Sequence, residues 1–554
     1  MRAALILAAA TSAYAQFHGR RQGHGYGGHH GWNNMPGRDW QDVPSSGNTT
    51  FTQLTDHNDP SVGTFEQFYF YDSTHWKGPG SPVILFTPGE IAAAGYASYL
   101  TINRTTGVLA AEIGAAVIVL EHRYWGTSSP YTELTTANMT YLTLDNSIKD
   151  LTYFANTAKL PFAHHGSNAA DVPWVLMGGS YSGALTAWTE SVAPGTFWAY
   201  WASSAVVEAI SDFWTYFLPV ELGMPKNCSS DVHLVIDYMD GVLKSGNESE
   251  IYELKDMFGL TNVTHNDDFM GVLENGPWQW QSNQFNSGKT RDVVISHLVL
   301  TCFPGPNGPF YEWCDAVEGV TNATNSTARP GPEGVGLEKA LAGYATWIKN
   351  FIPGTCEASG YAEFNGTNNT YCFNTYDGTS PQFTDLAVDN VYNRQWNWML
   401  CNEPFGYWQD GAPDGTPSLV SRLIDADYWV RQCDLWFPTG PNGETYGIAK
   451  GKTEADTNAY TGGWDGRNST RLLYVNGGYD PWRDATVSAD IRPGGPLEST
   501  EEVPVLIVPG GFHTSDLQTA NGAANASVKA VIDQGLAQMV EWVGEFPKRR
   551  HWTA

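Results

Sequence analysis

A serine flanked by glycines is the residue of this sequence whose setting most clearly suggests chemistry. An apolar run over residues 173–177 leads into GGSYSG at positions 178–183, and a helix-like stretch follows over 184–191. Glycines allow the strained strand-to-helix turn that exposes a nucleophilic serine. A strict G-x-S-x-G pattern would have glycine where Ser182 stands, so the alternative is a glycine-rich turn in which Ser180 caps a helix.

The general base can be sought by chain order, because hydrolases with such a turn supply serine, then an acid, then histidine. Two histidines follow residue 300, His513 and His551. His551 lies three residues from the end, in a basic tail. His513 follows an apolar run over 503–508 through Pro-Gly-Gly-Phe, a loop that can present a base at the end of a strand. We therefore expect His513 to be the base.

The acid of the triad is expected at Asp480. It stands in a loop directly after the apolar run 472–475, whereas Asp484 and Asp490 lie further past the turn and are more typical of a helix start or a surface charge. Ser180 and Asp480 are 300 positions apart, far more than one strand–helix–strand step needs. The sequence therefore predicts a large insertion between them.

These residues predict acyl transfer through a covalent intermediate. Ser180 Oγ would attack a carbonyl carbon, His513 would accept its proton, and Asp480 would hold the imidazole. The oxyanion needs two backbone donors, which we expect from Tyr181 and from Gly89 or Glu90 in the loop after residues 82–86.

Apolar runs separated by helix-like stretches predict an α/β sheet covered on both faces. The expected strands are residues 82–86, 115–120, 173–177, 198–205, 472–475 and 503–508. Tryptophans, cysteines and helical stretches such as Leu337–Phe351 replace this rhythm between about 207 and 465. The predicted organisation is a signal peptide at 1–15, a disordered leader at 16–50, core at 51–206, an inserted cap at 207–465, and core again at 466–554.

Several features favour export. Met1-Arg2, a short apolar stretch and Ala-Tyr-Ala at 13–15 form a signal-peptide pattern. The seven cysteines include no CxxC pair, which favours disulfides over zinc and leaves one thiol whose identity is not readable. N-glycans are expected at some of the sequons, which begin at Asn48, Asn103, Asn138, Asn227, Asn247, Asn262, Asn322, Asn325, Asn365, Asn368, Asn468 and Asn525. We expect a secreted protein, with an acidic vacuolar or lysosome-like compartment as the alternative.

Charge restricts the partners. With 30 basic and 58 acidic residues the formal net charge is −28, which disfavours nucleic acid and anionic membranes. No segment is long and apolar enough to suggest a membrane span. The sequence pI of about 4.7 suits work in an acidic medium, although acidity also keeps a secreted protein soluble.

Seven short segments resemble a known family, the serine peptidases that include lysosomal Pro-Xaa carboxypeptidase and dipeptidyl peptidase II (serine carboxypeptidase family twenty-eight). Within it the chain is most similar to secreted fungal acid prolyl endopeptidases. The segments are Asp56-His57, Pro88-Gly89-Glu90, residues 121–126 (EHRYWG), residues 178–183, Cys401-Asn402-Glu403, Asp480-Pro481-Trp482 and Gly511-Phe512-His513.

The resemblance implies an α/β-hydrolase core with a helical cap, and cleavage after proline at acidic pH without metal or organic cofactor. Proline-containing peptides or proteins would be the substrates. Tyr181 and Trp482 are the candidates for the proline pocket, because a proline ring must be held by shape and stacking. Glu403 or Glu90 would bind a substrate terminus, or else be a structural carboxylate buried with Arg123.

Three alternatives remain from the sequence. The enzyme could be an exopeptidase, either a Pro-Xaa carboxypeptidase or a dipeptidyl peptidase, if the cap blocks internal peptides. It could be a secreted esterase, since the same triad serves any acyl transfer. A non-catalytic binding module is disfavoured because Ser180, Asp480 and His513 are all present.

Overall fold

Six parallel strands form the centre of the sheet in the computed structural model, which describes residues 45–163, 166–286, 308–320, 330–466 and 469–547. They are β3 (Val83–Phe86), β4 (Ala116–Leu120), β5 (Trp174–Gly179), β6 (Ala199–Ser203), β9 (Leu472–Gly477) and β10 (Val505–Val508). Each falls within, or differs by a few residues from, a run that the sequence marked as a strand. Almost all residues of β3 to β6 and β9 are buried, as strands covered on both faces require.

Two antiparallel strands extend this sheet at one edge. β1 (Ser46–Leu54) pairs with β2 (Thr64–Asp72) along its whole length, and β2 pairs with β4. The strand order is β1-β2-β4-β3-β5-β6-β9-β10, which is an α/β-hydrolase sheet, as expected. β1 begins inside the segment expected to be a disordered leader, so that leader cannot extend past residue 45. Its pairing with β2 orders a polar sequence that has no apolar run of its own.

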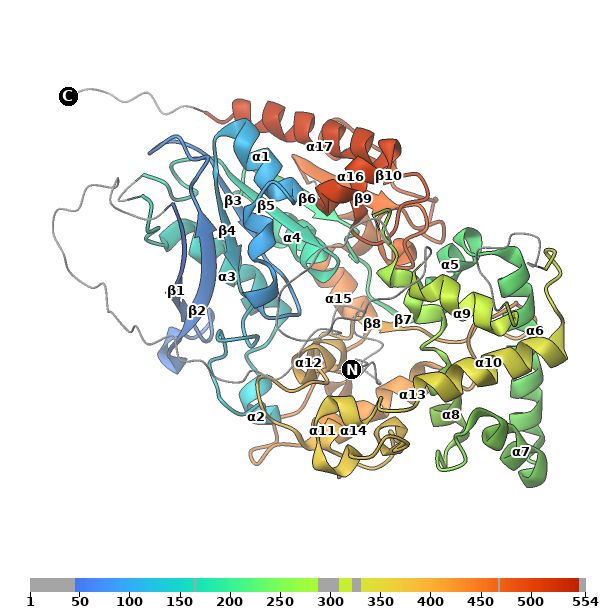
Figure 1. Ribbon diagram of the computed structural model, residues 1–554. Helices are drawn as coiled ribbons and strands as arrows, with labels where there is room; N and C mark the ends of the chain where they lie inside the picture. Colours follow the sequence, from blue (N-terminus) through green and yellow to red (C-terminus); the bar gives the residue numbers. More distant parts are fainter. Residues whose placement is uncertain (1–44, 164–165, 287–307, 321–329, 467–468, 548–554) are drawn as a thin grey trace, which may run out of the picture.

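Helices cover both faces of the sheet (Figure 1). α1 (Thr105–Ile113) and α17 (Ala526–Gly544) pack together on one face, where Leu109 and Ile532 share a buried cluster with β5 and β9. α3 (Leu144–Thr157) and α4 (Tyr181–Val192) pack on the other face, in a second cluster that continues into the insertion. The chain around α4 therefore lies between the sheet and the cap.

A mainly helical cap is inserted between β6 and β9, and it lies to the right of and below the sheet in Figure 1. The predicted helix Leu337–Phe351 is present with those limits as α10. The two short strands β7 (Ile210–Asp212) and β8 (Gly406–Trp408) pair in parallel. The other α-helices of this insertion are α5 (Leu218–Gly223), α6 (Lys226–Ser245), α7 (Glu248–Phe258), α8 (Asn266–Leu273), α9 (Pro309–Val317), α11 (Pro381–Thr384), α12 (Arg394–Asn402), α13 (Ala426–Val430), α14 (Gln432–Trp436) and α15 (Glu454–Thr461).

Three disulfides stabilise the cap, in line with the prediction that its cysteines are paired. They join Cys228 to Cys314, Cys356 to Cys372, and Cys401 to Cys433. The seventh cysteine, Cys302, lies outside the described residues, as do the expected signal peptide and most of the expected leader. The core is completed by two further helices, α2 (Thr136–Met139) and α16 (Thr519–Ala524).

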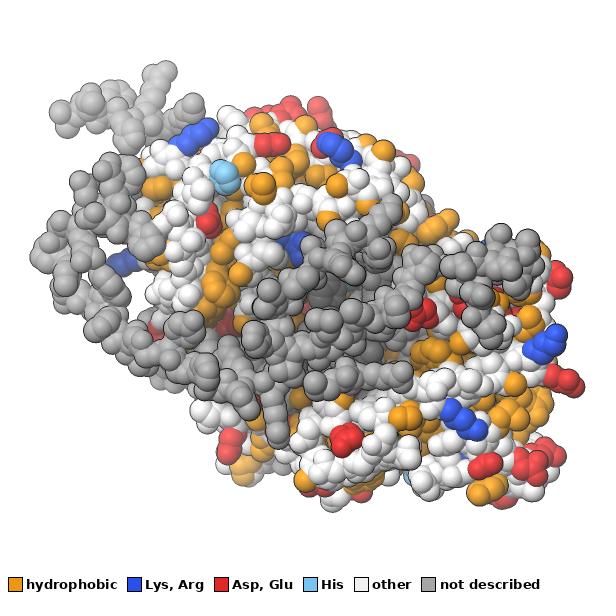
Figure 2. Space-filling model, viewed as in Figure 1, with side chains coloured by type: hydrophobic (Ala, Val, Ile, Leu, Met, Phe, Trp, Pro, Cys, Tyr) orange, Lys and Arg blue, Asp and Glu red, His pale blue; other side chains and the backbone are white. Residues whose placement is uncertain are grey.

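The described surface carries scattered charge. Figure 2 shows acidic side chains at several places around the rim of the visible face, with isolated lysines and arginines between them. None of the helices in the described ranges is long and apolar enough to cross a membrane.

Candidate active site

Ser180 lies at the sharp turn between β5 and α4. Its backbone has φ 61° and ψ −129°, a conformation that L-residues rarely adopt. A Cβ on Gly178 would lie 2.1 Å from the Ser182 carbonyl oxygen, and one on Gly183 would lie 2.5 Å from that of Ser203. Both positions therefore require glycine, and the strained backbone of Ser180 gives the turn the geometry expected of a nucleophile elbow.

Ser182 explains the departure from the strict G-x-S-x-G pattern. Its hydroxyl accepts a hydrogen bond from the Gly179 amide at 3.0 Å and donates one to the Gly179 carbonyl at 2.9 Å. The side chain is thus folded back against the turn. Serine therefore fits at this position as well as glycine, because its side chain is small and its hydroxyl is hydrogen-bonded within the turn.

Asp480 and His513 face each other from the loops after β9 and β10. His513 Nδ1 lies 2.9 and 3.0 Å from the two carboxylate oxygens of Asp480, and both side chains are buried. Asp480 also accepts a hydrogen bond from the Trp482 amide at 3.0 Å. This pair can fix the imidazole with Nδ1 protonated and Nε2 ready to accept a proton.

The Nε2 of His513 has no hydrogen-bond partner among the described residues. Ser180 is half-buried and lines one pocket together with Thr514, the residue after His513. The segment that carries His513 therefore borders the same pocket as Ser180, although no hydrogen bond joins the two side chains in this structure. Such contacts are often long in unliganded hydrolases and tighten when substrate binds.

The competing acids lie elsewhere. The Asp484 carboxylate accepts the amide of Asp490 at 3.3 Å, and Asp490 forms an ion pair with Arg483. Neither has a contact with His513. His551, the alternative base, lies outside the described residues.

The loop after β3 reaches the elbow. Gly89 has φ +78°, and a Cβ there would lie 3.2 Å from Ser182 Cβ and 3.3 Å from Tyr181 Cδ1. Tyr181 is the first residue of α4, where the amide has no carbonyl of its own helix to bind. Glu90 is buried, and its carbonyl accepts the Asn393 side-chain amide at 3.1 Å. The loop that carries Gly89 and Glu90 thus packs against Tyr181 and Ser182, and the Gly89 amide donates to Thr87 Oγ1 at 3.4 Å.

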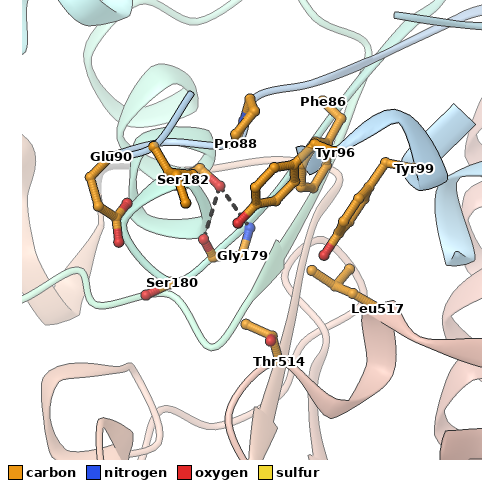
Figure 3. A pocket seen from close by; sticks show the side chains of 11 residues that line it. Phe86, Pro88, Glu90, Tyr96, Tyr99, Gly179, Ser180, Ser182, Thr514 and Leu517 are labelled. Atoms are coloured by element: carbon orange, nitrogen blue, oxygen red, sulfur yellow. Dashed lines mark hydrogen bonds between the residues drawn. The ribbon is translucent and has the colours of Figure 1, made fainter. Parts of the chain in front are cut away.

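A pocket opens directly beside Ser180 (Figure 3). Its walls come from β3 and the segment after it, from the elbow, and from the segment after His513. Phe86 and Tyr99 stack with ring centroids 4.1 Å apart and supply an aromatic wall. The residues that line it are Phe86, Pro88, Glu90, Ile91, Tyr96, Tyr99, Gly179, Ser180, Ser182, Thr514 and Leu517. Aromatic and hydroxyl side chains therefore share the lining of this pocket.

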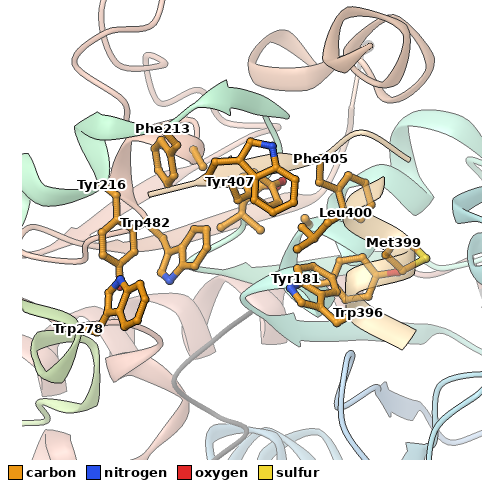
Figure 4. Packing of buried hydrophobic residues seen from close by; sticks show 14 of the residues in the cluster. Tyr181, Phe213, Tyr216, Trp278, Trp396, Met399, Leu400, Phe405, Tyr407 and Trp482 are labelled. Carbon is orange, nitrogen blue, oxygen red and sulfur yellow. The ribbon is translucent and has the colours of Figure 1, made fainter. Parts of the chain in front are cut away.

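Tyr181 is part of a buried aromatic cluster between the core and the cap (Figure 4). Its ring lies 5.1 Å from that of Trp396 in an edge-to-face contact. Its hydroxyl lies 3.1 Å from His122 Nε2, while His122 Nδ1 lies 2.9 Å from the Arg123 carbonyl. Burial lowers the pKa of His122 to about 4, so above that pH its ring is neutral and its Nε2 can accept a hydrogen bond from the Tyr181 hydroxyl.

Trp482 lies between the triad and the cap. Its ring centroid is 6.3 Å from that of His513, and its Nε1 donates to Gln281 Oε1 at 3.0 Å. Tyr216 donates to the same oxygen at 3.0 Å. Gln284 then donates to the His513 carbonyl at 2.8 Å. Gln281 and Gln284 contact the site from the cap, and nothing in their local sequence indicated this.

Glu403 is already engaged within the protein. One carboxylate oxygen accepts the Leu144 amide and the Asn402 side chain, and the other pairs with Lys452 at 2.5 Å. The carboxylate that pairs with Arg123 is Asp150, and Glu403 bonds to Leu144, Asn402 and Lys452 instead. Arg123 is fully buried against Asp150, to which its Nε donates at 2.7 Å. The nearer carboxylate satisfies this guanidinium.

No group of three or more histidine, cysteine or acidic side chains in the described ranges is arranged to hold a metal ion.

Comparison with known proteins assigns the family. The sequence model "Serine carboxypeptidase S28" matches residues 53–275 and 355–533. "Serine protease vicPa" of Bipolaris victoriae (strain FI3) is 40% identical over 503 residues, covering 90% of this chain and 89% of that protein. "Probable extracellular serine carboxypeptidase" of Arthroderma benhamiae (strain ATCC MYA-4681 / CBS 112371) is 29% identical over 474 residues, covering 82% of this chain and 60% of that protein. "Thymus-specific serine protease" of Mus musculus is 24% identical over 532 residues, covering 95% and 91%. The chain belongs to the serine carboxypeptidase S28 family and is a serine-type peptidase.

Proposed function

We propose that this peptidase hydrolyses peptide bonds on the carboxyl side of proline, with Ser180 as nucleophile, His513 as general base and acid, and Asp480 as the group that orients His513. The observation that carries the assignment is the buried hydrogen bond between Asp480 and His513 at the ends of β9 and β10, beside the strained elbow of Ser180.

The reaction follows from this geometry. Ser180 Oγ attacks the scissile carbonyl and transfers its proton to His513 Nε2, which then protonates the departing amine. Asp480 stabilises the imidazolium through Nδ1–H. Water then attacks the acyl-enzyme and gives a proton to the same nitrogen, which passes it to Ser180 Oγ as the acyl bond breaks and the carboxylic acid leaves. All groups that move protons belong to the chain itself.

Charge on the tetrahedral oxygen is stabilised by backbone amides. Tyr181 supplies one, and Gly89 or Glu90 supplies the second from the loop after β3. The close approach of Gly89 to Tyr181 and Ser182 supports this arrangement. Removing one such donor typically costs a serine hydrolase about 3 kcal/mol of transition-state stabilisation.

A proline on the acyl side would be held by aromatic surfaces. Tyr181 follows the proposed nucleophile directly, and the ring centroid of Trp482 lies 6.3 Å from that of His513, which supports these two rings as candidates for the proline site. A proline side chain has no hydrogen-bonding group, so flat apolar walls are the chemistry that selects it. For Glu403, the pairing with Lys452 supports a structural role better than a role in binding a substrate terminus.

Work at acidic pH outside the cell is supported by one partly buried acid and by one relative. Burial raises the pKa of Glu208 to about 7, so this carboxyl is best accommodated below neutral pH. The relative from Arthroderma benhamiae is named as extracellular. Sequons such as Asn48, Asn103 and Asn247 are exposed and accessible to glycans.

The division into core at 51–206 and 466–554 and cap at 207–465 also stays a prediction.

The test uses four kinds of substrate with one enzyme: a blocked peptide, its alanine analogue, an unblocked peptide and a short-chain ester. A peptide blocked at both ends with an internal proline should release product after that proline, and its proline-to-alanine analogue should not. Cleavage of unblocked peptides alone would show an exopeptidase and contradict endopeptidase action. Rapid hydrolysis of a short-chain ester with no peptide cleavage would contradict the prolyl specificity. Ser180→Ala is the matched control and should be inactive on all four.

A further inference from the structure

A fourth buried polar side chain lies close to the triad. Asp516, three residues after His513, is 1% exposed. Its Oδ1 accepts a hydrogen bond from Ser203 Oγ at 2.6 Å, and its Oδ2 accepts one from Trp201 Nε1 at 2.8 Å. Both donors belong to β6, the strand next to the one that carries the nucleophile. The carboxylate therefore ties the segment after His513 to the end of β6.

The same end of β6 also holds the nucleophile. The Ser203 carbonyl accepts the Ser180 amide at 3.0 Å, so Ser203 contacts the elbow through its backbone and Asp516 through its side chain. The next residue, Ser204, accepts the Thr514 amide on its hydroxyl at 2.9 Å. Two hydrogen bonds thus dock the His513 loop on the residues that fix Ser180.

The backbone at this junction is strained and needs such restraints. Ser180, Ser204 and Thr514 all have positive φ, at 61°, 45° and 52°. Non-glycine residues keep this conformation only where the surrounding contacts impose it. In Figure 3, Thr514 and Leu517 face Ser180 across the pocket, so a shift of the loop would move one wall relative to the nucleophile.

A purely structural role is the alternative, because buried carboxylates also stabilise regions far from any site. Asp268 in the cap is such a case. It is 2% exposed and accepts the Thr375 amide at 3.1 Å and the Tyr428 hydroxyl at 3.2 Å. The difference is the partner. Asp516 joins the segment after His513 to β6, whose Ser203 carbonyl accepts the Ser180 amide, whereas Asp268 joins segments of the cap.

We propose that Asp516 is a positioning residue, which sets the distance between His513 Nε2 and Ser180 Oγ by anchoring the His513 loop to Ser203 and Trp201. The inference rests on the proposed roles of Ser180 and His513. Asp516 touches no substrate. Its carboxylate is suited to the task because it accepts from two donors that come from the same strand, which fixes the loop in two directions.

The experiment compares Asp516→Asn, Ser203→Ala and their double variant with wild type. Asparagine keeps the volume, but its amide group cannot accept from both donors. Ser203→Ala removes one donor and leaves the backbone bond to Ser180. We expect Asp516→Asn to lower kcat by about 10²-fold, the size typical of misplaced catalytic groups, with KM changed less than about twofold. Phosphonylation of Ser180 by a fluorophosphonate should slow by a similar factor.

The double variant separates a shared contact from independent effects. If Asp516 and Ser203 act through one hydrogen bond, the losses in kcat should be much less than multiplicative. Asp268→Asn, the matched buried carboxylate, should lower the thermal midpoint without slowing phosphonylation. If Asp516→Asn fails to fold, Ser203→Ala alone decides, with a predicted fall in kcat of about 10-fold for the loss of one bond.

Two results would overturn the inference. One is phosphonylation of folded Asp516→Asn, or of Ser203→Ala, at the wild-type rate. The other concerns the control. It is a fall in kcat in Asp268→Asn that is as large, for each degree lost from the thermal midpoint, as the fall in Asp516→Asn. Absence of phosphonylation in wild type is a different outcome. It would contradict the assignment of Ser180 itself, and with it the function on which the inference rests.

Discussion

Asp410 should make the stability of this protein depend on pH. It follows β8, is 1% exposed, and has no hydrogen-bond donor on either carboxylate oxygen within the described part of the chain. Burial, and then the neighbouring Asp212, raise its pKa to about 10, and Glu274 and Asp425 act in the same direction. Asp410 is therefore protonated in the folded protein throughout the acidic and neutral range.

The magnitude follows from the unfolded chain, where an aspartate has a pKa near 3.8. Between pH 4 and pH 7 the unfolded state loses this proton and the folded state keeps it. Stability is thus complete below the unfolded pKa and falls as pH rises, by about 1.4 kcal/mol per pH unit. One carboxyl of this kind removes at most about 4 kcal/mol between pH 4 and pH 7.

The assay is the thermal midpoint of wild type and Asp410→Asn at pH 4, 5, 6 and 7, at one scan rate. Asparagine cannot lose a proton, so the variant should equal or trail wild type at pH 4 and exceed it by several degrees at pH 7. Asp414→Asn is the control, because the Asp414 side chain is 92% exposed and should change neither value. Parallel pH profiles for wild type and Asp410→Asn would refute the reasoning.

Three shorter predictions concern the elbow, the aromatic wall and the cap. Gly183→Ala places a Cβ 2.5 Å from a backbone oxygen of β6, so kcat should fall about 10²-fold while circular dichroism is retained; normal kcat would contradict the steric argument. Trp482→Ala should lower kcat/KM for a proline peptide by roughly 10-fold or more, with a much smaller effect on a short-chain ester; equal losses would argue against a proline contact. Cys401→Ser with Cys433→Ser opens a loop of 32 residues, which should cost about 4 kcal/mol of stability; an unchanged thermal midpoint would contradict this.

The sheet could be predicted from sequence because its central strands are short continuous apolar runs. β3, β4 and β5 each read as such a run and are buried on both faces. β1 could not be predicted in this way. Its residues alternate between exposed and half-buried, and its stability comes from pairing with β2, which local sequence does not record.

In the candidate site, too, some features could be predicted from local sequence and others depend on contacts across the fold. Chain order and loop position brought Ser180, Asp480 and His513 together as a hypothesis, since each follows directly after a strand of one parallel sheet. The contact between Ser203 and Asp516 spans 313 positions and has no local pattern. The carboxylate that pairs with Arg123 was likewise not predicted. Glu90 and Glu403 were considered because they lie in the resembling segments, whereas the partner is Asp150 on α3. Side-chain pairing across the fold needs the tertiary structure.

The central claim is that Ser180 is the nucleophile, and fluorophosphonate labelling tests it most directly. Wild type should bind one equivalent covalently, the labelled peptide should contain Ser180, and activity on proline peptides should disappear in proportion. Ser180→Ala should remain unlabelled and inactive, while Ser182→Ala, whose hydroxyl only bonds Gly179, should still be labelled. Failure of correctly folded wild type to react, or equal labelling of Ser180→Ala, would contradict the account.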